Sequence, residues 1–174
     1  MPLSSFSDVL LGFAHRGGMA DAPENSLEAF QKALAAGANG LESDVWLNAD
    51  GVPVLHHGKS LRGHPLSLAG LFAECGTDFD LSLDLKGPGT AEATVDACRA
   101  AGFDVSRLWL CAGLETCSRL RTWDADVRLV CDMGWTDALW RRSQAFARVA
   151  DAGVDAVNLR HGRWTRSFVA QAHE

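Results

Sequence analysis

Short apolar runs alternate with amphipathic stretches along this chain of 174 residues. The runs are typical of buried strands, whereas the stretches between them repeat apolar residues every three or four positions, as helices do. The pattern predicts strands over Val9–Phe13, Asp80–Lys86, Arg107–Cys111, Val127–Cys131 and Val154–Leu159. It predicts helices over Ser26–Leu34, Leu68–Glu74, Ala91–Ala101, Leu114–Thr122, Ser143–Ala152 and Thr165–His173. Strands separated by helices indicate parallel β–α–β crossovers.

An acidic strand and a hairpin follow the first helix, in the stretch GLESDVWLNADGVPVLHHG. Successive side chains of a strand point to opposite faces, so Glu42 and Asp44 share one face. The Asp-Gly pair that follows is a turn signature between β-type residues. A two-residue loop would place Asp44 opposite His57, and a three-residue loop would place it opposite His56. In either register a histidine returns beside two carboxylates, and this combination is typical of a catalytic site.

Six strand–helix units leave two α/β architectures open. One is a doubly wound open sheet, and the other is a (β/α)₈ TIM-type barrel truncated to about six units, because a complete barrel takes ~250 residues. Polar residues cluster after the first three strands: His15 and Arg16, Glu42 and Asp44, Asp84 and Lys86. A barrel carries its chemistry at these carboxyl ends. We therefore predict the barrel, with residues 1–174 forming one domain.

Composition excludes several classes of function. The net charge of −6 argues against a general nucleic-acid binder, which would carry a basic patch. No apolar run approaches the ~20 residues of a membrane span, and the N-terminus lacks the basic start of a signal peptide. The five cysteines are scattered without a Cys-x-x-Cys pair, and we interpret them as reduced core residues of a cytoplasmic protein.

Four motifs together carry a family resemblance. HRGG, PENSLEAFQKAL, LESDVWLNADGVPVLHH and LSLDLKG resemble those of the glycerophosphodiester phosphodiesterases, over about residues 13–87. The resemblance implies a phosphodiesterase barrel that holds one divalent cation with Glu42, Asp44 and Asp84. It implies that Lys86 lies beside this cation. All-oxygen ligation favours Mg²⁺ or Ca²⁺ over Zn²⁺.

The resemblance also implies that His15 and His57 act as an acid–base pair and that Arg16 binds phosphate. Imidazoles titrate near neutrality, so one can deprotonate the attacking hydroxyl while the other protonates the departing alcohol. Arg16 offers a planar fork of donors to phosphoryl oxygens. By resemblance, the attacking hydroxyl could belong to the substrate's own glycerol, which gives a cyclic phosphate that water later opens.

Simpler interpretations accompany these roles. Asp84 and Lys86 could form only an ion pair, and His56 could either pack outward or support the site. The HRGG segment is predicted to be an anion-binding turn in which glycine N–H groups face the ligand. Glu24, in the Pro-Glu-Asn entry to the first helix, is expected to orient the site without touching substrate.

Three departures from the family favour a second hypothesis. Gly58 stands where an acidic residue commonly follows the histidine, and residues 58–79 leave no room for the usual cap over the substrate. The strands expected to close a barrel are missing from this sequence. The alternative is therefore an inactive or incomplete member that serves as a binding or assembly module, and a homo-oligomer could cover its open barrel edges. Phospholipase D-like activity on lysophospholipids is a weaker candidate, because the chain is acidic.

Overall fold

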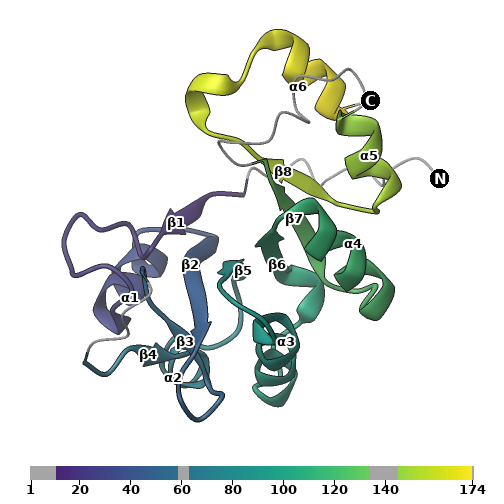
Figure 1. The fold of residues 1–174 in the computed structure, drawn as a ribbon. Coiled ribbons are helices and arrows are strands. Elements are labelled where there is room, and N and C mark those ends of the chain that lie inside the picture. The colour runs from purple at the N-terminus through teal and green to yellow at the C-terminus, as the bar shows by residue number, and fades with distance from the viewer. Residues whose placement is uncertain (1–10, 59–62, 134–144, 174) are drawn as a thin grey trace.

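In the described part of the chain, six parallel strands form the centre of the fold, and they follow one another in chain order. The computed structural model describes residues 11–58, 63–133 and 145–173 (Figure 1). The parallel strands are β1 (Phe13–His15), β2 (Gly40–Leu47), β5 (Asp80–Leu85), β6 (Leu108–Ala112), β7 (Arg128–Asp132) and β8 (Ala156–Asn158). Each pairs with its predecessor in this list. A doubly wound sheet would reverse its order midway, so the topology of the described strands is that of part of a (β/α)₈ barrel.

Helices connect these strands and lie on the outer side of their arc (Figure 1). They are α1 (Leu27–Ala35), α2 (Leu68–Cys75), α3 (Thr90–Ala100), α4 (Leu114–Trp123), α5 (Ala145–Asp151) and α6 (Arg166–His173). Two short 3₁₀ turns, η1 (Val105–Arg107) and η3 (His161–Arg163), precede β6 and α6. None of the helices in the described residues is long and apolar enough to cross a membrane.

The predicted elements are confirmed to within a few residues, except for the first strand. The prediction Val9–Phe13 is wrong, because β1 begins at Phe13 and ends at His15; residues 9 and 10 lie outside the described residues. The pairing of Phe13 with Gly40 and of His15 with Glu42 determines these bounds. Hydrogen bonds to β2, rather than local hydrophobicity, therefore decide where this strand lies. Residues 143 and 144 of the predicted fifth helix also lie outside the described residues.

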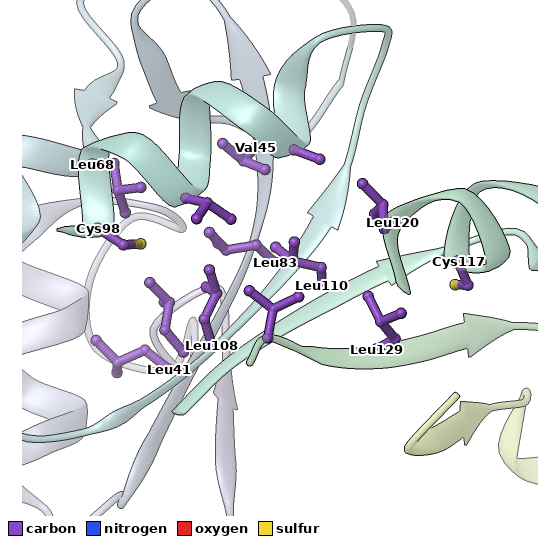
Figure 2. Close-up of a cluster of buried hydrophobic side chains, with 14 of the residues drawn as sticks. Leu41, Val45, Leu68, Leu83, Cys98, Leu108, Leu110, Cys117, Leu120 and Leu129 are labelled. Carbon is purple, nitrogen blue, oxygen red and sulfur yellow. The ribbon is translucent and has the colours of Figure 1, made fainter. Parts of the chain in front are cut away.

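The hydrophobic core lies between the outer faces of the strands and the helices (Figure 2). Leucines of β2, β5, β6 and β7 are fully buried there: Leu41, Leu81, Leu83, Leu108, Leu110 and Leu129. Cys98 of α3 and Cys117 of α4 join them (Figure 2). Four of the five cysteines are buried, and Cys75 is half-buried. The side chains that alternate with the leucines therefore face the inside of the arc.

The hairpin after β2 has a three-residue loop. Strand β3 (Pro53–Leu55) pairs antiparallel with β2, and β4 (Leu66–Ser67) pairs with β3. The backbone N–H of Asn48 donates to the carbonyl of Val52, which leaves three residues in the loop. The His56 N–H accordingly donates to the Asp44 carbonyl at 3.0 Å. Of the two predicted registers, the one that places Asp44 opposite His56 is therefore confirmed.

Candidate functional site

The carboxyl ends of β1, β2 and β5 lie side by side and bring the predicted site residues together. His15 pairs in register with Glu42, and Asp44 pairs with Asp84 on the neighbouring strand. Glu42, Asp44 and Asp84 alternate with buried residues such as Ser43, so all three point to the inner face. The alternation predicted from the sequence is confirmed at this point. It places three carboxylates on two adjacent strands.

Lys86 joins two of these carboxylates. Its Nζ lies 2.9 Å from Asp44 Oδ1 and 3.2 Å from Asp84 Oδ2. Burial lowers the pKa of Lys86, but the hydrogen bond to Asp44 and the charge of Asp84 outweigh it, so the pKa is raised overall. The predicted ion pair between Asp84 and Lys86 is therefore present, and it extends to Asp44.

The surroundings of Glu42 raise the pKa of its carboxyl group. Burial raises its pKa to about 7, against the hydrogen bond from the Arg16 backbone N–H, which lowers it. The charges of Asp84 and Asp44 raise it further. Nearby carboxylates and burial both oppose ionisation here, and a cation placed among these groups would relieve both effects.

The donor set therefore fits a hard divalent cation. Asp44 Oδ2 is buried and has no hydrogen-bond partner in the described part of the chain, since Arg16 Nε, at 3.6 Å, is beyond hydrogen-bond distance. Carboxylate oxygens are the ligands that Mg²⁺ and Ca²⁺ prefer. Across residues 11–58, 63–133 and 145–173, no three His, Cys, Asp or Glu side chains are yet arranged around one metal position. Lys86 Nζ provides the positive charge between Asp44 and Asp84 in this arrangement.

Arg16 is held in an unusual backbone conformation at the end of β1. Its φ of +50° lies in the left-handed region, which non-glycine residues rarely adopt. Its N–H donates to the Glu42 carbonyl at 2.9 Å and lies 3.1 Å from Glu42 Oε2. Its own carbonyl accepts from the Asn25 N–H at 3.1 Å. Such strained residues cluster at functional sites because the surrounding structure over-determines them.

The prediction of an anion-binding turn at HRGG is wrong for the glycine N–H groups. Gly17 N donates to the Ala14 carbonyl at 3.1 Å, and Gly18 N donates to the His15 carbonyl at 2.8 Å. Both donors are consumed within the turn and cannot face a ligand. Gly17 is instead required by packing, because a Cβ at this position would lie 2.6 Å from the Cβ of Ala29 on α1.

The two candidate acid–base histidines are both half exposed, and each lies near a carboxylate. His15 Nε2 lies 3.8 Å from Glu42 Oε2. His57 Nδ1 lies 3.6 Å from Glu24 Oε1. His56 turns elsewhere, with its Nδ1 3.2 Å from the Gly58 carbonyl. The side chains of Glu24, His56 and His57 line part of one cavity of about 520 Å³.

Further polar side chains lie at the ends of the later strands, where the sequence analysis predicted no site residue. Asp132 of β7 pairs in register with Asn158 of β8, and Asn158 Nδ2 lies 4.0 Å from Cys111 Sγ of β6. Burial raises the pKa of the Cys111 thiol, and Asp84 raises it further. The carboxyl-end rule that located the first three pairs would also have located these residues.

Comparison with known proteins adds a family match over part of the chain. The model of the glycerophosphoryl diester phosphodiesterase family matches residues 15–65. Glycerophosphodiester phosphodiesterase 1 of Rattus norvegicus is 52% identical over 50 residues, which make up 29% of this chain and 15% of the relative. The human protein of the same name is 50% identical over the same shares. The match therefore spans only a small part of these relatives.

Solved structures share the fold over most of the chain. A Galdieria sulphuraria protein described as a glycerophosphodiester phosphodiesterase has a TM-score of 0.78 and 21% identity, over 92% of this chain and 79% of that one. An Oleispira antarctica phosphodiesterase, solved in complex with the product sn-glycerol-3-phosphate, has a TM-score of 0.74 and 19% identity, over 92% and 78%. At these identities the likeness shows the fold alone.

Proposed function

Because residues 15–65 match the glycerophosphoryl diester phosphodiesterase family, we propose that the chain belongs to this family and hydrolyses a glycerophosphodiester to an alcohol and glycerol phosphate. One observation carries this proposal. Three carboxylates, a guanidinium group and two accessible imidazoles gather at the carboxyl ends of neighbouring strands. This is the chemistry that cleavage of a phosphodiester anion requires, because the anion repels nucleophiles and its alkoxide leaving group is poor.

In this proposal, two sets of residues offset the negative charge of the phosphodiester. Glu42, Asp44 and Asp84 would hold one divalent cation, Mg²⁺ or Ca²⁺, which supplies Lewis-acid stabilisation of the phosphoryl oxygens when bound. Arg16 donates to the phosphoryl group through its guanidinium fork. Lys86 Nζ, which pairs with Asp44 and Asp84, would lie beside a cation held there and could donate to substrate oxygens.

His15 and His57 move the protons. One imidazole accepts the proton of the attacking hydroxyl as the new P–O bond forms. The other donates a proton to the alkoxide oxygen as the old P–O bond breaks, so the products leave as an alcohol and a phosphate ester. Each half-exposed ring is accessible to a substrate. General acid–base catalysis of this kind contributes about 10²–10⁴-fold in rate.

The experiment that tests the proposal is turnover by the purified chain. Glycerophosphocholine, bis(p-nitrophenyl) phosphate and a lysophospholipid are incubated with the chain in Mg²⁺, Ca²⁺ or EDTA. We expect release of glycerol phosphate from the first substrate with a divalent cation and none in EDTA. Release of lysophosphatidic acid from the lysophospholipid, without turnover of glycerophosphocholine, would favour phospholipase D-like activity instead. The reduced cysteines favour a reducing compartment, and we propose the cytoplasm.

A second candidate, a binding or assembly module, rests on the strand edges. Among the described residues, β1 pairs only with β2 and β8 pairs only with β7. Unpaired edges of this kind template pairing with another strand. A second copy of the chain could cover them, and sedimentation of the purified chain would then show a dimer. A dimer that binds cation without turnover would support the module, whereas an active monomer would exclude it.

A further inference from the structure

Glu24 lies between two residues of the candidate site and contacts both of them. Its Oε2 accepts a hydrogen bond from Arg16 Nη1 at 3.0 Å. Its Oε1 lies 3.6 Å from His57 Nδ1. The three residues come from different segments: the turn after β1, the entry to α1 and the end of the hairpin. One carboxylate therefore connects Arg16, which is proposed to bind phosphate, with His57, which is proposed to move a proton.

We propose that Glu24 is a positioning residue that fixes the guanidinium of Arg16 and orients the ring of His57. The proposal rests on the proposed hydrolysis for its effect on rate, but the contacts themselves do not depend on it. Glu24 would touch neither the substrate nor the cation. It acts through the Arg16 guanidinium and the His57 ring, which contact the substrate in the proposed function.

The backbone around Glu24 is held independently of its side chain. Asn25 is buried, with φ at +57°, and its N–H donates to the Arg16 carbonyl. Its Oδ1 accepts from the Ser43 hydroxyl at 2.7 Å on the buried face of β2. Ser26 then caps α1, its Oγ accepting from the Ala29 N–H at 3.2 Å. The Glu24 side chain is itself 42% exposed, so its replacement leaves this scaffold in place.

The carboxylate selects one tautomer of His57. An acceptor near Nδ1 favours the proton on that nitrogen, which leaves Nε2 unprotonated and able to accept a proton. The distance of 3.6 Å is longer than a hydrogen bond, and catalytic contacts commonly shorten when substrate binds. The following residue, Gly58, has no side chain that could supply this contact. Among the described residues, Glu24 is the carboxylate within ion-pair distance of His57.

Glu24 also keeps the Arg16 guanidinium from turning onto the cation ligands. Arg16 has a second carboxylate neighbour, since its Nε lies 3.6 Å from Asp44 Oδ2. A guanidinium pairs with carboxylates in a bidentate manner when it can. The hydrogen bond to Glu24 holds Nη1 on the opposite partner and leaves that Asp44 oxygen without a hydrogen bond. Without Glu24, this carboxylate no longer competes with Asp44 for the Arg16 guanidinium, and Arg16 can form an ion pair with Asp44.

The test compares E24Q, E24A and E24D with a matched control, E28Q. Glu28 lies one helical turn away on α1 and pairs with Lys32 at 2.7 Å on the surface. Its replacement removes the same charge without touching the site. The readouts are kcat and KM for glycerophosphocholine, the thermal midpoint, and the long-range ¹H–¹⁵N correlations of the His57 ring, which report its tautomer.

We expect E24Q to lower kcat/KM about 10–100-fold, as loss of a group that orients a functional side chain does, while its thermal midpoint stays close to that of E28Q. E24D should recover part of the loss. In the wild-type chain the Nδ1–H tautomer of His57 should predominate, and E24Q should mix the two tautomers. Unchanged kinetics in E24Q, or a loss of activity matched by unfolding, would overturn the proposal. If the wild-type chain shows no turnover, the His57 spectrum still tests the positioning role of Glu24. Identical spectra of E24Q and wild type would overturn that role. A mixture of tautomers in E24Q alone would support it, and only the proposed function would then be refuted.

Discussion

Replacement of Gly17 by alanine tests how helix α1 and the turn after β1 are held together. Gly17 has a φ of +82°, and a Cβ there would lie 2.6 Å from Ala29 Cβ and 3.0 Å from Phe30 N. Both contacts are well inside the normal carbon contact distance of about 3.5–4.0 Å, and the second involves helix backbone. The turn carries Arg16 one residue earlier, so any displacement of Gly17 also moves the candidate site.

Gly18 provides the matched control for this variant. Its φ is +89°, but a Cβ there meets nothing within 4 Å. A left-handed non-glycine residue costs about 1–3 kcal/mol, and both variants incur that cost. Forcing an extra carbon into a packed contact costs about 1–3 kcal/mol more, and only G17A incurs it. The difference between the variants therefore isolates the packing of the turn on α1.

Thermal and urea unfolding measure this difference. We expect G17A to be less stable than G18A by about 1–3 kcal/mol, which for a chain of this size corresponds to roughly 2–12 °C in thermal midpoint. The hydrolysis rate of G17A should fall below that of G18A at a temperature where both are folded. Equal stability of the two variants would refute the packing argument.

Two further predictions concern buried carboxyl groups. The pKa of Glu42 rises from 4.5 in the unfolded chain to about 7 in the fold, so the fold binds an extra proton between these values. The stability that Glu42 contributes is then complete below about pH 4.5 and is lost as pH rises through 7. In EDTA, the free energy of unfolding of E42Q should rise by about 1–3 kcal/mol relative to that of wild type as the pH increases from 5 to 8. If urea unfolding gave the same pH dependence for both proteins, this prediction would be wrong. Asp124 is buried and accepts from Arg99 Nη2 at 2.7 Å and from the Asp126 N–H at 2.9 Å. D124A should lower the free energy of unfolding, measured with urea, by about 1–3 kcal/mol. D126A replaces an exposed side chain and should lower it little. Equal losses in the two variants would show that the buried pair of Asp124 and Arg99 contributes nothing.

Local pattern was sufficient to predict the parts of the site that lie on regular strands. The alternation in LSLDLKG places Asp84 inward because strand geometry alone dictates it. The same holds for Glu42 and Asp44 on β2. The sequence left two possible registers for the hairpin, and the backbone hydrogen bond from Asn48 N–H to the Val52 carbonyl shows which one forms. These features depend on neighbours in sequence.

The turn after β1 could not be predicted in the same way, because its geometry depends on distant partners. Arg16 and Asn25 adopt positive φ values through hydrogen bonds to each other and to β2. Within the same turn, the N–H groups of Gly17 and Gly18 donate to the carbonyls of Ala14 and His15. This fold of the turn brings Glu24 beside His57. The sequence predicts that Glu24 orients the site, but it does not indicate that Arg16 and His57 are the residues that Glu24 contacts. The bounds of β1 were missed for the same reason, since pairing with β2 determines them.

The central claim, acid–base hydrolysis of a phosphodiester at the ends of β1, β2 and β5, is tested most directly by the turnover of H57A. Glycerophosphocholine hydrolysis is measured in saturating Mg²⁺ or Ca²⁺ for wild type, H57A and a control, H161A, at an exposed histidine of η3. We predict that H57A loses about 10²–10⁴-fold in kcat while H161A keeps the wild-type rate and both variants stay folded. A wild-type rate in folded H57A, or a folded wild-type chain that binds the cation without any turnover, would contradict the account.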